Sequence, residues 1–417
     1  MKNLTLKYPH LISIAILFSC LIACDEEDHT IKKTEVREAA EITLEKHGDI
    51  ISGSYIVTLK QGSAQSNMRT MKGYANRQAV AKPLMHEMIK RAGLQLNQLE
   101  NVYSAAGMMG FSINNVASSN LARLKRMPEV ESITPNRVIA LLPSYCDLYP
   151  WMDACSSEAH ANSGQTIPWG VTWVGGPTDM SNSSKKAFVI DTGIDLDHPD
   201  LNLNTSLSVS FVGSNGNDGN GHGTHLAGTI GAIDNNIGVV GVAAGIQLVA
   251  VQVLNNQGSG SYAGVIAGID YVAQTGEPGD VVNLSLGGPA NNSIDNAVIA
   301  LGASGIYISI AAGNAAQNAN NVSPARVNGA NIFTVSNMNN KGWLANTSNY
   351  GNPPIDYAAP GTNILSTWLN GGYNTLSGSS MAAAHVSGLL LVTNGNIQIN
   401  GYANGDPDGT PDPIAHQ

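Results

Sequence analysis

Short apolar runs alternate with stretches of helical spacing through the second half of the chain, and this alternation restricts the fold more than any other feature. We expect strands at residues 186–190, 247–253, 281–286 and 306–311, and helices at 223–233, 262–274 and 293–304. Strands that are apolar on both faces are typical of parallel sheets buried under helices. The sequence therefore predicts an α/β fold, with a mostly parallel sheet covered by helices on both faces. In such sheets the reactive side chains lie at the carboxyl ends of the strands.

The first candidate reactive side chain follows the first of these strands, in the sequence VIDTGID. Asp191 comes directly after the apolar residues, where burial lets a carboxylate accept a histidine N–H and fix the imidazole tautomer. Asp-Thr-Gly also occurs in aspartic peptidases, whose chemistry needs two carboxylates that share one proton. The chain has no second Asp-Thr-Gly or Asp-Ser-Gly. A serine-type mechanism is therefore favoured over this alternative.

A histidine that could pair with this acid lies in GNGHGTHLAGTIG. Glycines on both sides of His222 allow a substrate and a serine to approach closely at the start of a helix. His225 follows three residues later, but helical metal pairs usually have i, i+4 spacing and an intervening glutamate. We expect His222 to be the base and His225 to be a packed structural residue.

A serine nucleophile is expected in SGSSMAAAHVSG. The small residues after Ser380 predict a tightly packed helix whose N-terminal dipole faces a developing oxyanion. Ser379 is the rival nucleophile, because a helix-capping role suits either serine.

Taken together, the three segments resemble the subtilase family, and the proteinase K branch more than the bacterial subtilisins. The order Asp, His, Ser is the subtilisin order, and the resemblance covers most of residues 165–393. It implies a serine endopeptidase that uses Asp191, His222 and Ser380 as its catalytic triad, because the family nucleophile is the serine directly before Met-Ala. A non-catalytic lipoprotein that binds peptides with an inactive protease fold is the alternative, and an intact triad argues against it.

The resemblance also assigns a second oxyanion donor. The sequence AAGN resembles the family's oxyanion segment, which places the Asn314 amide beside the Ser380 backbone N–H. Two positions depart from the usual family pattern: Ser379 stands where threonine is common, and Ala384 stands where proline is common. Neither change removes a catalytic group.

Further segments resemble the family's substrate-binding elements. NLSLGG and GSGSY resemble the two segments between which a substrate lies as an added strand, a mode of recognition that depends mainly on the backbone. The implied substrate-binding residues are Gly258, Ser259, Gly260, Ser285, Leu286 and Gly287, with Ala312 and Gly313 at the pocket base. Small residues at that base leave room for apolar or aromatic P1 side chains.

Calcium is common in this family, although the chemistry needs no cofactor. Asp356 matches a family calcium aspartate, with carbonyl ligands expected at residues 328–330. A solvated loop aspartate is the alternative, because an oxygen site needs several ligands. Three further aspartates near the C-terminus, Asp406, Asp408 and Asp412, lie among proline and glycine and are interpreted as exposed turns.

Upstream of this domain, the pattern predicts a small α+β unit. We expect strands at residues 53–59, 110–113 and 130–136, a helix within 76–99, and a second helix with Asn120 as its N-cap. The order, ending in VESITPNRV, resembles the inhibitory prosegment of subtilases, which docks its C-terminal tail into the protease cleft. The implied product is a zymogen that cleaves itself within residues 138–165.

The N-terminus has the features of an export signal. Lysines precede an apolar stretch at residues 11–23, which is too short to span a membrane comfortably. It ends in Leu-Ile-Ala-Cys, which resembles the lipobox of bacterial lipoproteins and implies a lipid on Cys24. An ordinary cleaved signal is the alternative.

Charge and cysteine content support an exported protein. The chain has 21 Lys and Arg against 31 Asp and Glu, and the acidic excess lies after residue 140. The acidic part repels nucleic acid. The basic residues of 50–140 complement its charge, which favours binding between the two parts, and two independently solvated surfaces are the alternative. In an exported chain, Cys146 and Cys155 are expected to form a local disulfide.

We therefore expect a monomer that acts on proteins or peptides, is inhibited by its own prosegment, and meets a membrane only through Cys24. The expected organisation is a lipoprotein-type signal peptide at 1–24, an acidic tether at 25–50, the inhibitory prosegment at 51–140, a junction loop at 141–164 and the catalytic domain at 165–417.

Overall fold

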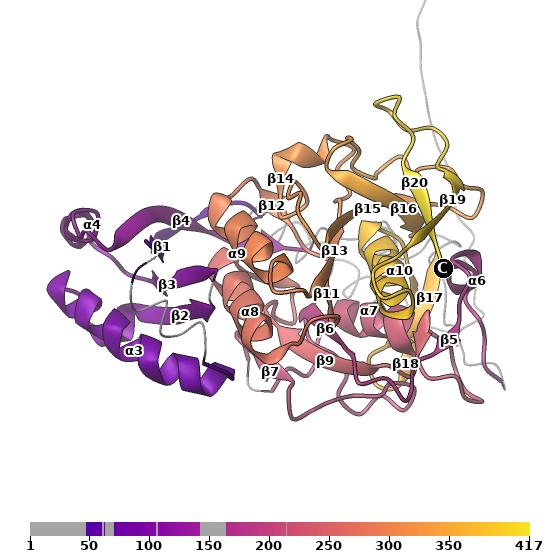
Figure 1. Cartoon of the computed structure of the whole chain (residues 1–417), viewed down its shortest axis with the longest axis horizontal. Helices are drawn as coiled ribbons and strands as arrows, with labels where there is room; N and C mark the ends of the chain where they lie inside the picture. Colours follow the sequence, from indigo (N-terminus) through magenta and orange to yellow (C-terminus); the bar gives the residue numbers. More distant parts are fainter. Residues whose placement is uncertain (1–46, 61, 63–70, 106, 142–163, 214) are drawn as a thin grey trace, which may run out of the picture.

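The computed structural model of the chain describes residues 47–60, 62, 71–105, 107–141, 164–213 and 215–417. The predicted signal peptide with Cys24, most of the acidic tether and the predicted Cys146–Cys155 disulfide lie outside the described residues. Figure 1 shows a small N-terminal unit, coloured indigo to purple, packed against a larger unit formed by the described residues from 164 onward. Within the described ranges, no helix has both the length and the apolarity needed to cross a membrane.

A nine-stranded sheet forms the centre of the larger unit, in the order β19-β20-β16-β15-β13-β11-β6-β9-β7. From β7 to β20, neighbouring strands are parallel, and β19 pairs antiparallel with β20 at the edge. The strands are β6 (Lys186–Asp191), β7 (Val209–Ser210), β9 (Gln247–Gln252), β11 (Val281–Leu284), β13 (Tyr307–Ala311), β15 (Ile332–Met338), β16 (Ile355–Pro360), β19 (Gln398–Tyr402) and β20 (Pro413–His416).

Helices cover both faces of this sheet, as predicted. Helices α8 (Tyr262–Thr275) and α9 (Asn292–Gly302) contribute to the core on one face, and α7 (His222–Gly231) and α10 (Ser379–Val392) to the core on the other. Successive residues of β6 alternate between the two cores: Phe188 lies in the first and Val189 in the second. This alternation follows from the two-residue period of a strand, and it explains why the strands are apolar at every position.

Smaller elements complete the larger unit: α6 (Trp169–Trp173), β5 (Thr178–Asp179), β8 (Ala243–Ala244), β10 (Ser259–Ser261), β12 (Gly288–Pro289), η2 (Ala319–Asn321), β14 (Val322–Ser323), β17 (Ile364–Trp368) and β18 (Gly372–Leu376). The predicted strands and helices between residues 186 and 311 are confirmed, with bounds that shift by at most two residues.

The small unit is an antiparallel sheet with two helices on one side. Its elements are β1 (Ile50–Leu59), α3 (Tyr74–Arg91), η1 (Leu96–Gln98), β2 (Leu99–Ala105), β3 (Met108–Ile113), α4 (Ser118–Leu124) and β4 (Val130–Ala140). The sheet order is β10-β4-β1-β3-β2, so it ends on a strand of the larger unit. Both helices contribute to the apolar core of the small unit, α3 with Met85 and Ile89 and α4 with Leu124.

Two details of the small unit correct the sequence predictions. The helix expected within residues 76–99 ends at Arg91. Gly93 has a φ of +76°, a left-handed conformation that ends the helix, and the Leu94 N–H donates to the Ile89 carbonyl. Residues 99–105 then form β2, a strand that the pattern did not show. Asn120 is not an N-cap: it lies inside α4, and its Nδ2 donates to the carbonyls of Ala92 and Gly93 at the end of α3.

The small unit also begins upstream of the predicted boundary at residue 51. Strand β1 starts at Ile50, the Gly48 N–H donates to the Val138 carbonyl, and Asp49 accepts from the Val138 N–H. Residues 47–50, assigned to the tether by composition, are therefore paired with β4.

Candidate active site

An acid–base pair lies at the carboxyl end of β6. Asp191 is the last residue of this strand and is fully buried, and His222 is the first residue of α7. The His222 Nδ1 lies 2.7 Å from the Asp191 Oδ1, which also accepts the Thr192 N–H at 2.8 Å. This carboxylate therefore fixes the orientation of the imidazole and the ring nitrogen that carries its proton.

The start of α7 is held by a buried aspartate that the sequence reading missed. Asp218 accepts the backbone N–H groups of Asn220 and Gly221 through Oδ1, and the N–H and hydroxyl of Thr224 through Oδ2. Gly223 needs to be glycine, because a Cβ there would lie 2.0 Å from the Gly193 carbonyl oxygen. Asp218 lies four residues before His222 in a polar stretch, where capping turns are common, so its role had no distinct sequence signal.

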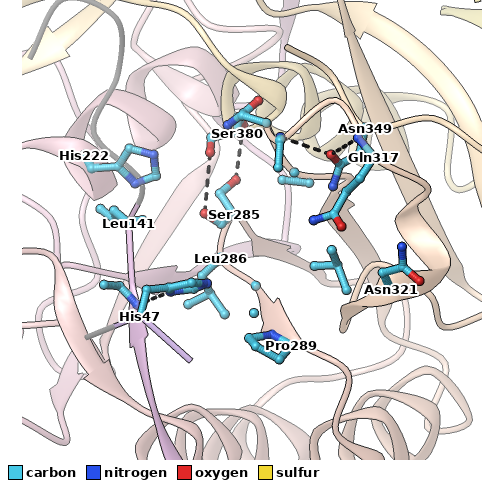
Figure 2. A pocket seen from close by; sticks show the side chains of 18 residues that line it. His47, Leu141, His222, Ser285, Leu286, Pro289, Gln317, Asn321, Asn349 and Ser380 are labelled. Atoms are coloured by element: carbon cyan, nitrogen blue, oxygen red, sulfur yellow. Dashed lines mark hydrogen bonds between the residues drawn. The ribbon is translucent and has the colours of Figure 1, made fainter. Parts of the chain in front are cut away.

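Ser380 and Ser379 have different surroundings. Ser380 is the second residue of α10 and lines the same pocket as His222 (Figure 2), and its Oγ lies 3.5 Å from the Ser285 carbonyl oxygen. Ser379 is fully buried, and its Oγ accepts the Gly313 N–H at 3.0 Å. Of the two serines, only Ser380 therefore faces the pocket.

Asn314 lies beside the start of α10. Its Oδ1 accepts the Ser379 N–H at 2.9 Å, which leaves the amide Nδ2 as a donor, and Asn314 lines the pocket with Ser380. The first N–H groups of a helix have no partner within the helix, so the Ser380 N–H and the Asn314 Nδ2 are two candidate donors at one pocket.

The pocket itself has a volume of about 370 Å³. The predicted residues Ser285, Leu286, Gly287 and Gly313 line it, whereas Ala312 does not. Ala312 is fully buried, and its carbonyl accepts the Asn349 Nδ2 at 2.8 Å. Ala312 therefore supports the wall from behind, which corrects its assignment to the pocket base.

Asn349 is a further pocket residue that the sequence did not reveal. Its Oδ1 accepts the N–H groups of Ala315 and Gln317, so this one side chain holds the wall that follows Asn314. Other residues of the lining that were not predicted are His47, Ala140, Leu141, Gly288, Pro289, Ala311, Ala315, Gln317, Asn321 and Val322. Gly288 and Ala311 end and begin the NLSLGG and AAGN segments, whereas the others lie outside the recognised motifs.

The edge of β10 is occupied by the small unit. Ser259 pairs with Ala140 and Gly260 with Ile139 in an antiparallel ladder, and the Leu141 N–H donates to the Gly258 carbonyl at 2.9 Å. Ala140 and Leu141 also line the pocket. The predicted strand-binding segment at residues 258–260 thus binds an extended strand, and that strand belongs to the same chain.

His225 is a packed residue. It is fully buried, its Nε2 lies 2.9 Å from the Ile364 carbonyl oxygen, and its ring meets Trp368 edge to face. Burial lowers the pKa of His225 to about 3, so its imidazole is neutral at physiological pH.

Asp356 lies on β16 and is partly buried, with the Thr334 N–H donating to its Oδ2 at 2.8 Å. Burial raises the pKa of this carboxyl to about 6. Among residues 47–417, within the described ranges, no group of three or more His, Cys, Asp or Glu side chains is arranged to hold a metal. A calcium site at Asp356 would therefore depend on backbone carbonyls and stays a prediction.

Of the three C-terminal aspartates, Asp406 is partly buried and Asp412 is fully buried, which corrects the prediction of exposed turns. Asp412 is fully buried and accepts from the Ser336 hydroxyl and the Asn352 Nδ2. Burial, together with the nearby carboxylate of Asp406, raises the pKa of Asp412 to about 6, although the two hydrogen bonds oppose this shift. Asp412 therefore ties the C-terminal segment to β15, whereas Asp408 is exposed as expected.

The fold and these side chains together define a serine peptidase, with an acid–histidine pair and a helix-borne serine at one pocket. The subtilase family model matches residues 187–399, and the peptidase inhibitor I9 model matches residues 54–142. The chain belongs to the subtilase family: it is a subtilisin-like serine endopeptidase preceded by an inhibitor I9 prosegment.

Known proteins resemble both units. The chain is 35% identical to the subtilisin-like serine protease AsES of Sarocladium strictum, over 76% of this chain and 82% of that protein. It is 31% identical to proteinase R of Parengyodontium album, over 86% and 84%. A crystal structure of a cold adapted subtilisin-like serine proteinase matches with a TM-score of 0.52 and 36% identity, over 60% of this chain and 97% of that one.

Proposed function

We propose that Ser380, His222 and Asp191 are the catalytic triad that hydrolyses peptide bonds. The observation that carries this assignment is the 2.7 Å contact between His222 Nδ1 and Asp191 Oδ1, at a pocket that Ser380 also lines. His222 removes the proton from the Ser380 hydroxyl through its Nε2 as the hydroxyl attacks the carbonyl carbon, and it later donates that proton to the leaving amine. Because Asp191 faces an imidazole rather than a second carboxylate, its geometry favours this mechanism over that of an aspartic peptidase.

The Ser380 N–H and the Asn314 Nδ2 would stabilise the oxyanion of the tetrahedral intermediate. Collapse of that intermediate leaves an acyl group on Ser380, and a water activated by His222 then releases it. The Ser380 N–H also lies at the start of α10, where the helix dipole favours negative charge.

Protein or peptide substrates would bind as an extended strand along β10, as the chain's own tail does. The residues that line the pocket include no acidic or basic side chain other than its two histidines. Apolar or aromatic P1 side chains are therefore the proposed preference. Segments 258–260 and 285–287 would contact the substrate backbone.

The precursor would be a zymogen whose prosegment assists folding and blocks the cleft until cleavage within residues 138–165. The pairing of Ala140 with Ser259 supports this function, because it fills the edge that a substrate needs. Export through residues 1–24 and a lipid on Cys24 would place the precursor at a cell surface, and cleavage would leave the lipid on the prosegment. An active enzyme that still carries the Cys24 lipid would contradict this route.

A calcium ion at Asp356 would add stability and take no part in the reaction. Residues 328–330 would supply the carbonyl ligands that hard cations prefer.

The decisive experiment labels the protein with a fluorophosphonate, which reacts with activated serines. We expect labelling and prosegment release in the wild type, and neither in Ser380→Ala. Ser379→Ala is the matched control, because it removes a neighbouring hydroxyl that accepts a hydrogen bond from the Gly313 N–H. This variant should still be labelled. Labelling that persists in Ser380→Ala would contradict the assignment.

A further inference from the structure

The tail of β4 is flanked by two strands in the cleft. On one side it pairs with β10, through Ile139 opposite Gly260 and through the Leu141 N–H. On the other side lie residues 47–49, which precede the segment that matches the inhibitor I9 family at 54–142. The tail thus has a second partner that comes from outside the recognised inhibitor domain.

The contacts on this second side are antiparallel but bulged, because Gly48 and Asp49 both bond to Val138. The Gly48 N–H donates to the Val138 carbonyl at 3.0 Å, and the Val138 N–H donates to the Asp49 carbonyl at 2.9 Å. Two residues further on, the Ala140 N–H donates to the His47 Nδ1 at 3.1 Å. Because successive residues of a strand direct their N–H groups to opposite edges, Val138 and Ala140 bond to residues 47–49, while Ile139 and Leu141 face β10.

A bend in β1 brings these residues to the cleft. The β1–β4 ladder is interrupted between Ile50 and Tyr55, and Gly53 has a φ of +72° within that interval. The Arg137 Nη1 then donates to the Gly48 carbonyl at 2.6 Å, across the resumed ladder. The N-terminal end of β1 therefore follows the tail instead of leaving the sheet.

The same residues contact the wall of the catalytic domain. Gly48 is buried and has a φ of +84°, and a Cβ there would lie 2.8 Å from the Pro289 Cγ. His47 is partly buried and lines the pocket together with Leu286 and Pro289 (Figure 2). Residues 47–49 therefore lie between the tail and the pocket wall formed by residues 286–289.

We propose that residues 47–49 form a second inhibitory strand, so that a two-stranded ribbon rather than the tail alone fills the cleft. The inhibitory strand extends the inhibitor beyond its family domain, with His47 as the side chain that lines the pocket. This inference rests on the proposed function, because the cleft is inhibited only if it is the active site.

Amide hydrogen exchange in the full-length chain tests the strand directly. The background is Ser380→Ala, which keeps the chain unprocessed. In His47→Ala we expect the Ala140 amide to exchange at least about tenfold faster, because it loses its only acceptor on that side, a change of the size of one net hydrogen bond. Ile139 and Leu141, which face β10, should keep their protection.

Asp49→Ala is the matched control. Asp49 is exposed and contributes its backbone carbonyl to the ladder, so removing the carboxylate should leave the Val138 and Ala140 amides protected. Gly48→Ala is the stronger perturbation, because the new methyl group meets Pro289 in a backbone conformation that favours glycine. It should expose both amides.

The functional consequence is measured in the chain with Ser380 intact, as the lag before a chromogenic peptide is hydrolysed. Gly48→Ala should shorten this lag at least about tenfold, since three hydrogen bonds of the inhibitory strand are lost. An Ala140 amide that stays protected in His47→Ala, or a lag unchanged in Gly48→Ala, would overturn the inference. A wild type that never reacts with the fluorophosphonate would instead refute the proposed function, and the exchange result would stand independently.

Discussion

Asp270 on α8 provides the sharpest test of how the prosegment is held. It is nearly fully buried, and its Oδ1 accepts the backbone N–H groups of Ser104 and Ala105, at 2.7 and 2.6 Å, from the end of β2. Its Oδ2 accepts the Gln274 Nε2 at 2.7 Å. Burial raises the pKa of Asp270 to about 7, against the opposing effect of these backbone donors. One carboxylate of the enzyme thus satisfies two donors of the prosegment.

The cost of removing this carboxylate follows from the two donors. A buried donor left without an acceptor costs about 1–3 kcal/mol, so Asp270→Ala should weaken prosegment binding by about 2–6 kcal/mol. Because the free enzyme regains hydration of Asp270 when the prosegment leaves, we expect the lower half of this range. A loss of about 2–4 kcal/mol corresponds to an inhibition constant raised about 30- to 900-fold.

The assay compares mature wild-type and Asp270→Ala enzymes, with the prosegment polypeptide 47–141 as inhibitor and a chromogenic peptide as substrate. An unchanged kcat/KM without inhibitor establishes that the variant is folded. Asp270→Asn is the matched control. It keeps an oxygen that can accept both N–H groups, so it should raise the inhibition constant less than Asp270→Ala does. An inhibition constant within about threefold of the wild type for Asp270→Ala would refute this reasoning, because it would mean that the two donors are not buried in the complex.

Three further outcomes are expected. Asn314→Ala should lower kcat about 10²- to 10³-fold with little change in KM, the size measured for such a donor in a subtilisin; steady-state kinetics check this, and a change confined to KM would contradict it. His225 has a pKa lowered by burial, so its stabilising contribution is complete above pH 6.5 and is lost as the pH falls toward 3. In Ser380→Ala, the free energy of unfolding measured with urea should fall between pH 7 and pH 4.5. This fall should be about 3 kcal/mol larger than in a protein that also carries His225→Gln. Equal falls in the two proteins would count against a buried neutral imidazole. Gly110→Ala should destabilise the prosegment by about 1–3 kcal/mol, because the new Cβ would lie 2.1 Å from the Val57 carbonyl oxygen; the yield of active enzyme on refolding should fall, and an undiminished yield would refute it.

Much of the fold and the reactive residues could be predicted from local patterns. Fully apolar runs such as residues 186–190 predict buried parallel strands, and the structure shows why, since Phe188 and Val189 enter opposite cores. The segments around Asp191, His222 and Ser380 each carry enough neighbouring glycine and small residues to identify the family, because close backbone approach at those points tolerates little else. These features are properties of contiguous sequence.

Features that depend on partners distant in sequence emerged only from the tertiary structure. Asn120 is a residue type that favours N-cap positions. Its amide instead donates to the carbonyls at the end of α3, because that helix ends nearby in space. Asp412 has the context of an exposed turn, yet it is buried against Ser336. Ser379 and Ser380 have different surroundings because the Gly313 N–H donates a hydrogen bond to the Ser379 hydroxyl.

The N-terminal boundary of the prosegment shows the same limit. The composition of residues 47–49 indicates a tether, but pairing with Val138 and Ala140 makes them part of the folded unit. Strand pairing depends on which strand edge lies beside a segment in space. For residues 47–49 that edge belongs to β4, about 90 residues further along the chain. The sequence alone therefore predicted the class of fold and the candidate reactive side chains, whereas the tertiary structure decided which polar groups are satisfied and which segments pair beside the pocket.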